Sequence, residues 1–330
     1  MHQERRTKKT TSALWITRAF QAELKEGPEP VLNEGDILVR TQWSGISRGT
    51  ERLVFEGRVP ASEVERMRAP MQEGCFPFPV KYGYCAVGTV EQGPSELLGR
   101  SVFALHPHQD RFAVPAGLAI PVPEGIPPKR AVLCASLETA LNAIWDGGCG
   151  PGDRIVVVGG GVVGLLTARL AARIPGTKVT LVDRDLGRRA LAEHLGASFA
   201  DPGTAPGDAD VVFHTSASAQ GLGTAVACAG FEARIVEMSW YGSGAVEASL
   251  GGAFHSRRLQ LVSSQVGHVP PSRRARWTAR RRLEAAMALL DDPRLDVLVA
   301  GEVAFSALPQ ALRDILRGDA HGLPPVVTYS

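Results

Sequence analysis

The stretch Ile155-Val-Val-Val-Gly159-Gly160-Gly161-Val-Val-Gly164 decides the fold of this chain. The run Arg154–Val158 at its start is continuously apolar after the arginine, which is typical of a buried strand in a parallel sheet. Residues 163–173, which follow the glycines, favour a helix. The stretch therefore predicts a strand, a tight glycine turn and a helix in direct succession.

The three glycines of this G-x-G-x-x-G pattern each suit a dinucleotide site. Gly159 permits the tight turn, Gly161 lets the backbone approach a pyrophosphate, and Gly164 lets the helix pack close to the strand. The helix then begins at Val162 and Val163 with its free N–H groups directed at the phosphates. A bare glycine pattern is weak evidence, but the strand before it and the helix after it supply the context that the motif requires.

Asp183 ends the next predicted strand, a little over 20 residues beyond the turn. A carboxylate there accepts hydrogen bonds from the ribose hydroxyls of the adenosine half and repels a 2′-phosphate, so NAD(H) is the preferred cofactor. Arg184 beside it would tolerate NADP(H), which leaves that cofactor open. Arg188 is predicted to stack on the adenine or to lie near the ribose.

Composition excludes several classes of protein. The 330 residues carry 36 basic and 34 acidic side chains, a net charge of +2, so neither nucleic acid nor an anionic membrane is an expected partner. The five cysteines form no C-x-x-C pair, which indicates a reducing cytoplasm and no structural zinc cluster. No apolar run is long enough to span a membrane. Glycine is in excess: 36 of the 330 residues are glycine, about 11%, against a usual frequency of roughly 7%.

The predicted secondary structure changes along the length of the chain. The first third predicts short antiparallel strands, with a surface helix at 62–72. The middle third alternates strands and helices, which indicates a doubly wound parallel sheet. The last third predicts a long helix at 273–290, a strand at 295–300, a helix at 308–317 and a closing strand at 326–329. The fold class is therefore α/β.

Four segments carry a resemblance to a known family. They are Ser44-Gly-Ile-Ser-Arg-Gly-Thr-Glu51, Gly83-Tyr-Cys-Ala-Val-Gly-Thr-Val90, residues 137–143 and the glycine motif. Over about residues 12–329 the chain resembles the medium-chain dehydrogenase/reductase superfamily, and the first segment is similar to the bacteriochlorophyllide a dehydrogenase branch.

The resemblance implies a GroES-like β-rich catalytic domain that is split around a Rossmann domain. The expected division is a disordered tail at 1–11, the catalytic domain at 12–128, the NAD-binding domain at 129–268 and the rest of the catalytic domain at 269–330. It also implies a homodimer in the cytoplasm that acts on a small-molecule substrate.

The zinc ligands of the family are missing from this sequence. The positions that hold them read Ser47, Tyr84, Cys85 and about Ala135, of which only Cys85 is a usual zinc ligand. A zinc-independent enzyme without a metal site is therefore expected. A rearranged site that combines Cys85 with His106 or His108 is the alternative.

Without zinc, another group must stabilise the developing alkoxide. Tyr84 is the first candidate because a phenol can donate a hydrogen bond or a proton, and Ser47 could relay that proton. Glu138 is a candidate base or a supporting residue, and His108 a candidate that titrates near neutral pH. For Tyr84 the competing interpretation is a core aromatic residue, for Glu138 a solvated helix position, and for His108 an exposed loop.

The resemblance suggests further contacts with ligands. Arg48 is expected to reach the cofactor pyrophosphate, and Thr139 to face the nicotinamide. The expected substrate pocket contains two residues of the catalytic domain and two that follow a nucleotide-domain strand: Cys85, His106, Trp240 and Tyr241. Core packing is an equally good explanation for Trp240 and Tyr241.

Six arginines lie within residues 273–282 and are interpreted as a solvated helix face or a subunit contact, since the overall charge is balanced. Taken together, the sequence predicts an NAD(H)-dependent oxidoreductase that interconverts a secondary alcohol and a ketone, on a side chain of a ring-bearing metabolite. The alternatives are reduction of an activated C=C bond in the manner of quinone reductases, and a non-catalytic NAD-binding sensor or structural protein on the same fold.

Overall fold

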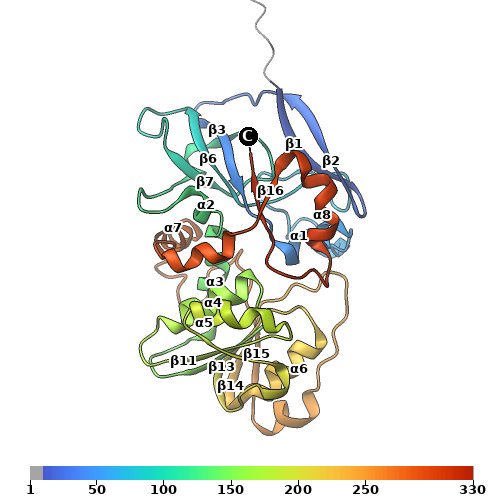
Figure 1. Cartoon of the computed structure of the whole chain (residues 1–330), viewed down its shortest axis with the longest axis vertical. Coiled ribbons are helices and arrows are strands. Elements are labelled where there is room, and N and C mark those ends of the chain that lie inside the picture. The colour runs from blue at the N-terminus through green and yellow to red at the C-terminus, as the bar shows by residue number, and fades with distance from the viewer. Residues whose placement is uncertain (1–9, 330) are drawn as a thin grey trace, which may run out of the picture. The chain divides into compact units, whose positions relative to one another are not determined.

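The computed structural model describes residues 10–329 of the chain and divides it into two compact units. One unit contains residues up to Leu133 together with those from Val299 onward, and the other contains Cys134–Leu298 (Figure 1). The sequence placed residues 269–298 in the catalytic domain, whereas in the structure they cluster with the nucleotide-binding residues. No helix among residues 10–329 is long and apolar enough to cross a membrane.

The 134–298 unit is built on a six-stranded parallel sheet in the order β12-β11-β10-β13-β14-β15. Its strands are β10 (Arg154–Val158), β11 (Lys178–Val182), β12 (Ser198–Ala200), β13 (Ala209–His214), β14 (Ala229–Glu237) and β15 (Gln260–Ser263). The order runs outward from β10 in one direction and then resumes on its other side with β13. This reversal defines the switch point of a Rossmann sheet, so the predicted doubly wound fold is confirmed.

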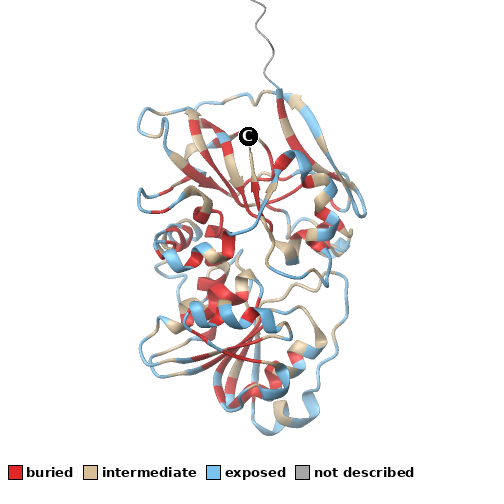
Figure 2. Ribbon diagram, in the orientation of Figure 1, coloured by how far each residue is buried: buried red, intermediate tan, exposed pale blue. Residues whose placement is uncertain are grey.

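Helices and short turns make up the rest of this unit. They are α3 (Cys134–Gly147), α4 (Val162–Ala172), α5 (Arg189–His194), α6 (Ala219–Cys228) and α7 (Ala279–Leu289), with short turns η3 (Leu186–Arg188), η4 (Pro202–Thr204), η5 (Leu250–Phe254) and η6 (Pro293–Val299). Helix α4 packs on β10 and β11, and α6 packs on β10 and β13. Because both faces of the sheet are covered, the central strands are buried along most of their length (Figure 2).

The other unit is β-rich and mostly antiparallel. Its strands are β1 (Thr10–Arg18), β2 (Gln21–Pro28), β3 (Asp36–Ser44), β4 (Glu73–Gly74), β5 (Val80–Lys81), β6 (Ala86–Gln92), β7 (Ser101–Ala104), β8 (Arg111–Pro115), β9 (Ile120–Pro121), β16 (Glu302–Ala304) and β17 (Val326–Thr328). They form a sheet in the order β2-β1-β5-β4 and a larger one in the order β16-β17-β3-β6-β7-β9, with β8 paired to β3. The C-terminal strand β17 thus pairs with β3, which comes from the first part of the chain.

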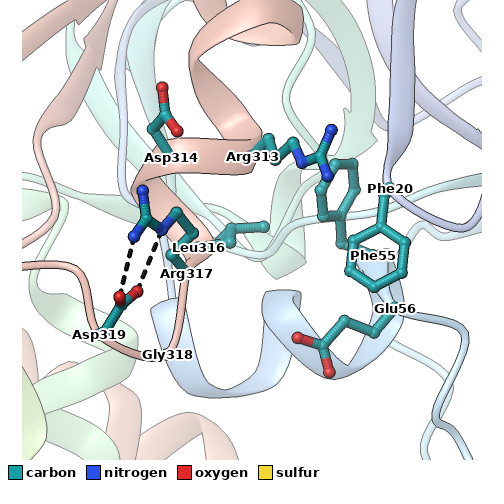
Figure 3. A pocket seen from close by; sticks show the side chains of 9 residues that line it. All are labelled: Phe20, Phe55, Glu56, Arg313, Asp314, Leu316, Arg317, Gly318 and Asp319. Carbon is teal, nitrogen blue, oxygen red and sulfur yellow. Dashed lines mark hydrogen bonds and ion pairs between the residues drawn. The ribbon is translucent and has the colours of Figure 1, made fainter.

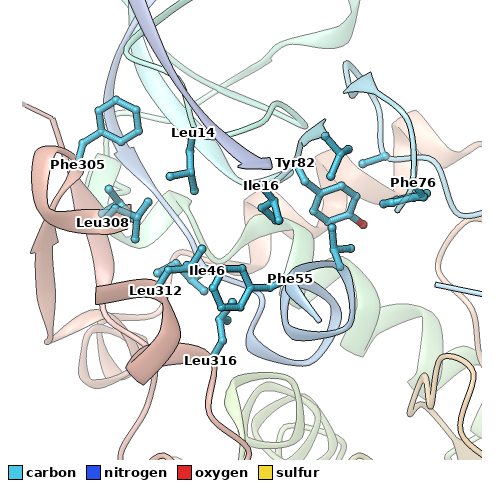
Figure 4. Packing of buried hydrophobic residues seen from close by; sticks show 14 residues of the cluster. Leu14, Ile16, Ile46, Phe55, Phe76, Tyr82, Phe305, Leu308, Leu312 and Leu316 are labelled. Atoms are coloured by element: carbon cyan, nitrogen blue, oxygen red, sulfur yellow. The ribbon is translucent and has the colours of Figure 1, made fainter. Parts of the chain in front are cut away.

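Helices and turns close the β-rich unit: α1 (Arg48–Phe55), η1 (Ala61–Glu63), η2 (Ala116–Leu118), α2 (Pro128–Ala131), η7 (Phe305–Ala307) and α8 (Leu308–Leu316). Leu308, Leu312 and Leu316 recur every fourth residue along α8 and pack against Leu14 and Ile46 in one apolar core (Figure 4). Segments from both ends of the chain therefore share this core.

Four local expectations from the sequence are wrong. Residues 62–72 form only the short turn η1 and further turns, because Pro70 disfavours helical geometry at the residue before it. The long helix starts at Ala279, where Thr278 caps it by accepting a hydrogen bond from the Arg281 N–H. Residues 295–300 lie mostly in the helical turn η6 instead of a strand. Thr10 and Thr11 of the expected tail begin β1, and residues 1–9 lie outside the described chain.

Candidate cofactor and catalytic sites

The glycine turn has the geometry of a dinucleotide cradle. Gly159 has a φ of +114°, which a residue with a side chain rarely adopts, and a Cβ at Gly164 would lie 1.9 Å from the Gly159 carbonyl oxygen. A Cβ at Gly161, by contrast, would meet nothing within 4 Å. Gly161 is also the N-cap residue of α4 and has no side chain that could accept a hydrogen bond from the first turn. The N–H groups at the start of the helix therefore stay available to a phosphate.

Asp183 directly follows β11 and is tied to this turn. One carboxylate oxygen accepts the Gly160 N–H at 2.5 Å and the other accepts the Asp185 N–H at 2.7 Å. Each oxygen keeps a second lone pair for a ribose hydroxyl. Arg188 is buried with its Nε 3.2 Å from Asp185 Oδ2, and a Cβ at Gly160 would lie 3.0 Å from its Cγ. Arg184 is exposed. The structure thus brings Asp183 and Arg188 together at the glycine turn.

In the β-rich unit, Tyr84 and Ser47 meet. The Tyr84 hydroxyl donates to Ser47 Oγ at 2.5 Å, and the ring packs against the apolar core of α8. Burial and the neighbouring Cys85 thiol raise the pKa of Tyr84, although hydrogen bonds from the Ser47 and Thr50 side chains oppose this shift. Tyr84 therefore stays a neutral phenol at physiological pH and acts as a donor.

A buried carboxylate orients this pair. Glu51 Oε1 accepts the Ser47 N–H at 2.7 Å, and Glu51 Oε2 lies 3.1 Å from His108 Nε2. His108 Nδ1 lies 2.7 Å from Ser44 Oγ, which in turn is 2.9 Å from the Tyr329 hydroxyl. His108 is 1% exposed. It is therefore a buried part of the scaffold behind Ser47, and a direct role in catalysis stays a prediction.

His106 and Cys85 are also buried. The His106 ring stacks on Phe112 with ring centroids 3.9 Å apart, and burial lowers the pKa of His106 to about 3. The structure therefore does not support a histidine at position 106 that titrates near neutral pH. Burial and Glu51 raise the pKa of the Cys85 thiol, so it stays protonated.

These residues do not form a zinc site. Ser47 and Tyr84 are not usual zinc ligands and are hydrogen-bonded to each other, so Cys85 is the single usual ligand at these positions. Among residues 10–329, no three His, Cys, Asp or Glu side chains are grouped so that they could hold a metal ion. The donor set therefore does not fit the family's catalytic zinc, and no step of the proposed chemistry uses one.

Two predicted residues make contacts within their own units that the sequence did not indicate. Arg48 donates from Nε to the Ile315 carbonyl at 2.9 Å and from Nη1 to the Gly322 carbonyl at 2.8 Å. The Thr139 hydroxyl bonds to the Ala135 carbonyl one helical turn earlier. Their contacts with a cofactor stay predictions.

Glu138 is 2.9 Å from Arg282 Nε in a buried ion pair. Burial raises the pKa of Glu138, and the charge of Arg282 opposes the shift. Arg282 is 1% exposed and also donates to the Asn142 side chain and the Val266 carbonyl. It is thus a buried partner rather than part of a solvated arginine face. Hydrophobic periodicity could have indicated this, because Ala286 and Met287 lie on the same helix face and are buried.

Trp240 and Tyr241 are half-buried in the segment after β14, and the Tyr241 hydroxyl donates to Glu237 Oε2 at 3.0 Å.

A separate hollow of about 580 Å³ lies in the β-rich unit (Figure 3). None of the residues predicted from the sequence lines it. Its walls combine two phenyl rings with five charged side chains, and the lining residues are Phe20, Phe55, Glu56, Arg313, Asp314, Leu316, Arg317, Gly318 and Asp319.

No protein-family model matches the chain. Among curated proteins, it is 28% identical to the D-guloside 3-dehydrogenase of Escherichia coli, over 88% of this chain and 91% of that enzyme. Among solved structures, the L-idonate 5-dehydrogenase of Escherichia coli has a TM-score of 0.78 at 17% identity, covering 97% of this chain and 98% of that one.

A second structure, described as a short chain alcohol dehydrogenase of Escherichia coli in complex with NADH, has a TM-score of 0.76 at 17% identity and covers 97% of this chain and 99% of that one. These likenesses show that the chain has the fold of nicotinamide-dependent alcohol dehydrogenases. The named relatives and the shared fold, together with the glycine turn, support the medium-chain dehydrogenase/reductase superfamily for this chain.

Proposed function

We propose that this protein is an NAD(H)-dependent, zinc-independent oxidoreductase that interconverts a secondary alcohol and a ketone. The observation that carries the proposal is the glycine turn with Asp183 bound to it, because that arrangement suits a dinucleotide with an unphosphorylated adenosine ribose. The likeness to guloside and idonate dehydrogenases supports alcohol oxidation. The preference for NAD(H) over NADP(H) rests on Asp183 alone.

The nicotinamide supplies or accepts the hydride, and the chain's own residues handle the proton. In the direction of reduction, the Tyr84 hydroxyl donates its proton to the oxygen that becomes the alcohol. The phenolate then regains a proton from solvent water, and Ser47, which hydrogen-bonds to Tyr84 as Thr50 also does, relays it. Glu51 holds the Ser47 backbone, so the donor keeps its position during the reaction.

The substrate that we propose is a secondary hydroxyl carried by a ring-bearing metabolite. The sequence predicts this class, and the guloside relative is consistent with it, since a guloside contains a sugar ring. The cytoplasmic location and the homodimer stay predictions.

A cofactor-oxidation screen tests the proposal. Purified protein is mixed with NADH or NADPH and with ring-bearing ketones, sugar ketones, open-chain ketones and enones, and absorbance at the nicotinamide band is followed. We expect turnover of ketones with NADH preferred. Turnover of enones alone would instead indicate C=C reduction, and tight NADH binding without any turnover would indicate a sensor or structural protein.

A further inference from the structure

Glu237, His214 and Ser216 form a hydrogen-bonded chain that the proposed chemistry does not use. Glu237 Oε2 is 2.7 Å from His214 Nδ1, and His214 Nε2 is 2.8 Å from Ser216 Oγ. His214 ends β13 and has no exposed surface, whereas Glu237 ends the neighbouring strand β14. Ser216 is exposed. The chain therefore runs from a carboxylate, through a buried imidazole, to a hydroxyl at the surface.

The protonation state of Glu237 follows from its hydrogen-bond partners. Burial pushes the pKa of Glu237 upward, but hydrogen bonds from His214 and Ser239 outweigh it and lower the pKa, so Glu237 is ionised. An ionised carboxylate only accepts, so Nδ1 of His214 donates its proton to Glu237. The Ser216 hydroxyl lies 2.8 Å from His214 Nε2 and 3.0 Å from the Ser218 hydroxyl. It can donate to one of these partners and accept from the other, which leaves one oxygen lone pair for an incoming donor.

Ser216 lies at the glycine turn. Thr215, between His214 and Ser216, donates its hydroxyl to the Gly159 carbonyl at 2.9 Å. A Cβ at Gly159 would lie 2.9 Å from the Ser216 backbone nitrogen. The exposed end of the hydrogen-bonded chain is therefore adjacent to the turn that cradles a pyrophosphate.

Strand order gives the direction in which a dinucleotide would extend from this turn. Asp183 follows β11 on one side of β10, and His214 ends β13 on the other side. Ligands of such sheets lie across the carboxyl ends of the strands at the switch point. A dinucleotide whose adenosine ribose meets Asp183 must therefore place its second half over the ends of β13 and β14.

We propose that Ser216, oriented by His214 and Glu237, accepts a hydrogen bond from a hydroxyl of the second ribose of the dinucleotide. This inference rests on the proposed function, because it requires that a dinucleotide binds at the glycine turn. Ser216 contacts the ligand, whereas His214 and Glu237 are positioning residues.

The first turn of α6 leaves room for this arrangement. A Cβ at Gly221 would lie 2.0 Å from Ser216 Oγ and 2.8 Å from His214 Nε2. Any side chain at position 221 would thus displace the serine from the imidazole. The absence of a side chain at Gly221 is a requirement of the hydrogen-bonded chain.

Binding of three nucleotides tests the proposal: AMP, which has only the first ribose, ADP-ribose, which adds the second, and NADH, which adds the ring. Calorimetry is done on the natural protein, on Ser216→Ala and on Thr224→Ala, which removes a hydroxyl from α6 away from the chain. We expect Ser216→Ala to weaken ADP-ribose and NADH by about 3- to 10-fold, the size of one hydrogen bond, and to leave AMP unchanged. Thr224→Ala should change none of the three.

Other outcomes overturn the inference. Weakening of NADH alone would move the contact to the nicotinamide ring, and equal weakening of all three, or of none, would remove Ser216 from the second ribose. If the natural protein binds none of the three nucleotides, the proposed function fails first and this inference fails with it.

The positioning role of His214 is tested with His214→Gln, alone and combined with Ser216→Ala. If His214 acts through Ser216, His214→Gln weakens ADP-ribose binding when Ser216 is present. It should cause no further loss of affinity when Ser216 is already replaced by alanine. Thermal unfolding of each variant shows whether it is folded. Additive losses in the double variant would mean that His214 affects the site independently of Ser216, which would overturn the positioning role.

Discussion

Tyr84 is the residue on which the proposed proton transfer depends, and its neighbour Tyr82 provides a matched control. Both are tyrosines of the β-rich unit, but Tyr82 belongs to the apolar core (Figure 4). We expect Tyr84→Phe to lower kcat for ketone reduction by about 100-fold or more, because the proton donor is lost. Tyr82→Phe should leave kcat unchanged. An unaltered rate in Tyr84→Phe would show that the phenol is not the donor.

His106 makes stability depend on pH. It is neutral in the folded protein, where burial lowers its pKa to about 3, whereas an unfolded chain protonates it near pH 6.5. Its contribution is therefore fully present above about pH 6.5 and is lost as the pH falls toward 3, at up to about 1.4 kcal/mol per pH unit. Urea unfolding at pH 7 and pH 5 should show a larger loss for the natural protein than for His106→Phe. Equal losses in both proteins would contradict the buried neutral state.

At the level of elements, the turn between β10 and α4 contains two glycines with different expected roles. Gly164 is needed for folding and Gly161 for binding the cofactor. Gly164→Ala places a methyl group 1.9 Å from the Gly159 carbonyl oxygen, which backbone atoms cannot relieve without moving. We expect a loss of about 3 kcal/mol of unfolding free energy, the upper end for overpacking. Gly161→Ala meets open space and should keep its stability, but it should bind NADH more weakly because the methyl group occupies the phosphate cradle. Chemical unfolding and NADH titration of both variants check this, and unchanged affinity in Gly161→Ala would contradict the cradle.

Helices α3 and α7 are joined by the buried Glu138–Arg282 pair. Arg282→Met leaves the carboxylate of Glu138 buried without its cation, so we expect a loss of about 3–5 kcal/mol in unfolding free energy. The double variant Glu138→Leu/Arg282→Met removes both charges and should recover part of that loss. If the double variant is as unstable as the sum of the two single variants, the pair is not coupled.

At the scale of the whole molecule, zinc independence is a measurable property. Because the donor set around Ser47 and Cys85 does not fit zinc, we expect elemental analysis to find far less than one zinc per chain. Dialysis against a chelator should change neither the unfolding temperature nor ketone reduction. About one zinc per chain, with activity lost on its removal and restored by zinc, would overturn the proposal.

Much of the proposed cofactor site could be predicted because its signals are local. A strand, a glycine turn and a helix follow one another within residues 154–172, and Asp183 ends the next strand. Hydrophobic pattern and the conformational freedom of glycine are properties of neighbouring residues, so the sequence alone predicts the element types, the turn and the acidic residue.

The tertiary structure decided which polar side chains meet and which are buried. Glu51 and His108 are 57 residues apart, Glu138 and Arg282 are 144 apart, and the bond from Ser44 to Tyr329 spans 285 residues. These contacts depend on how strands pair and helices pack within each unit, so no local pattern contains them. For the same reason, the sequence placed Arg282 on a solvated face and His106 in the substrate pocket, whereas both side chains are buried. The pKa and the role of an ionisable side chain depend on the three-dimensional neighbours that replace water around it.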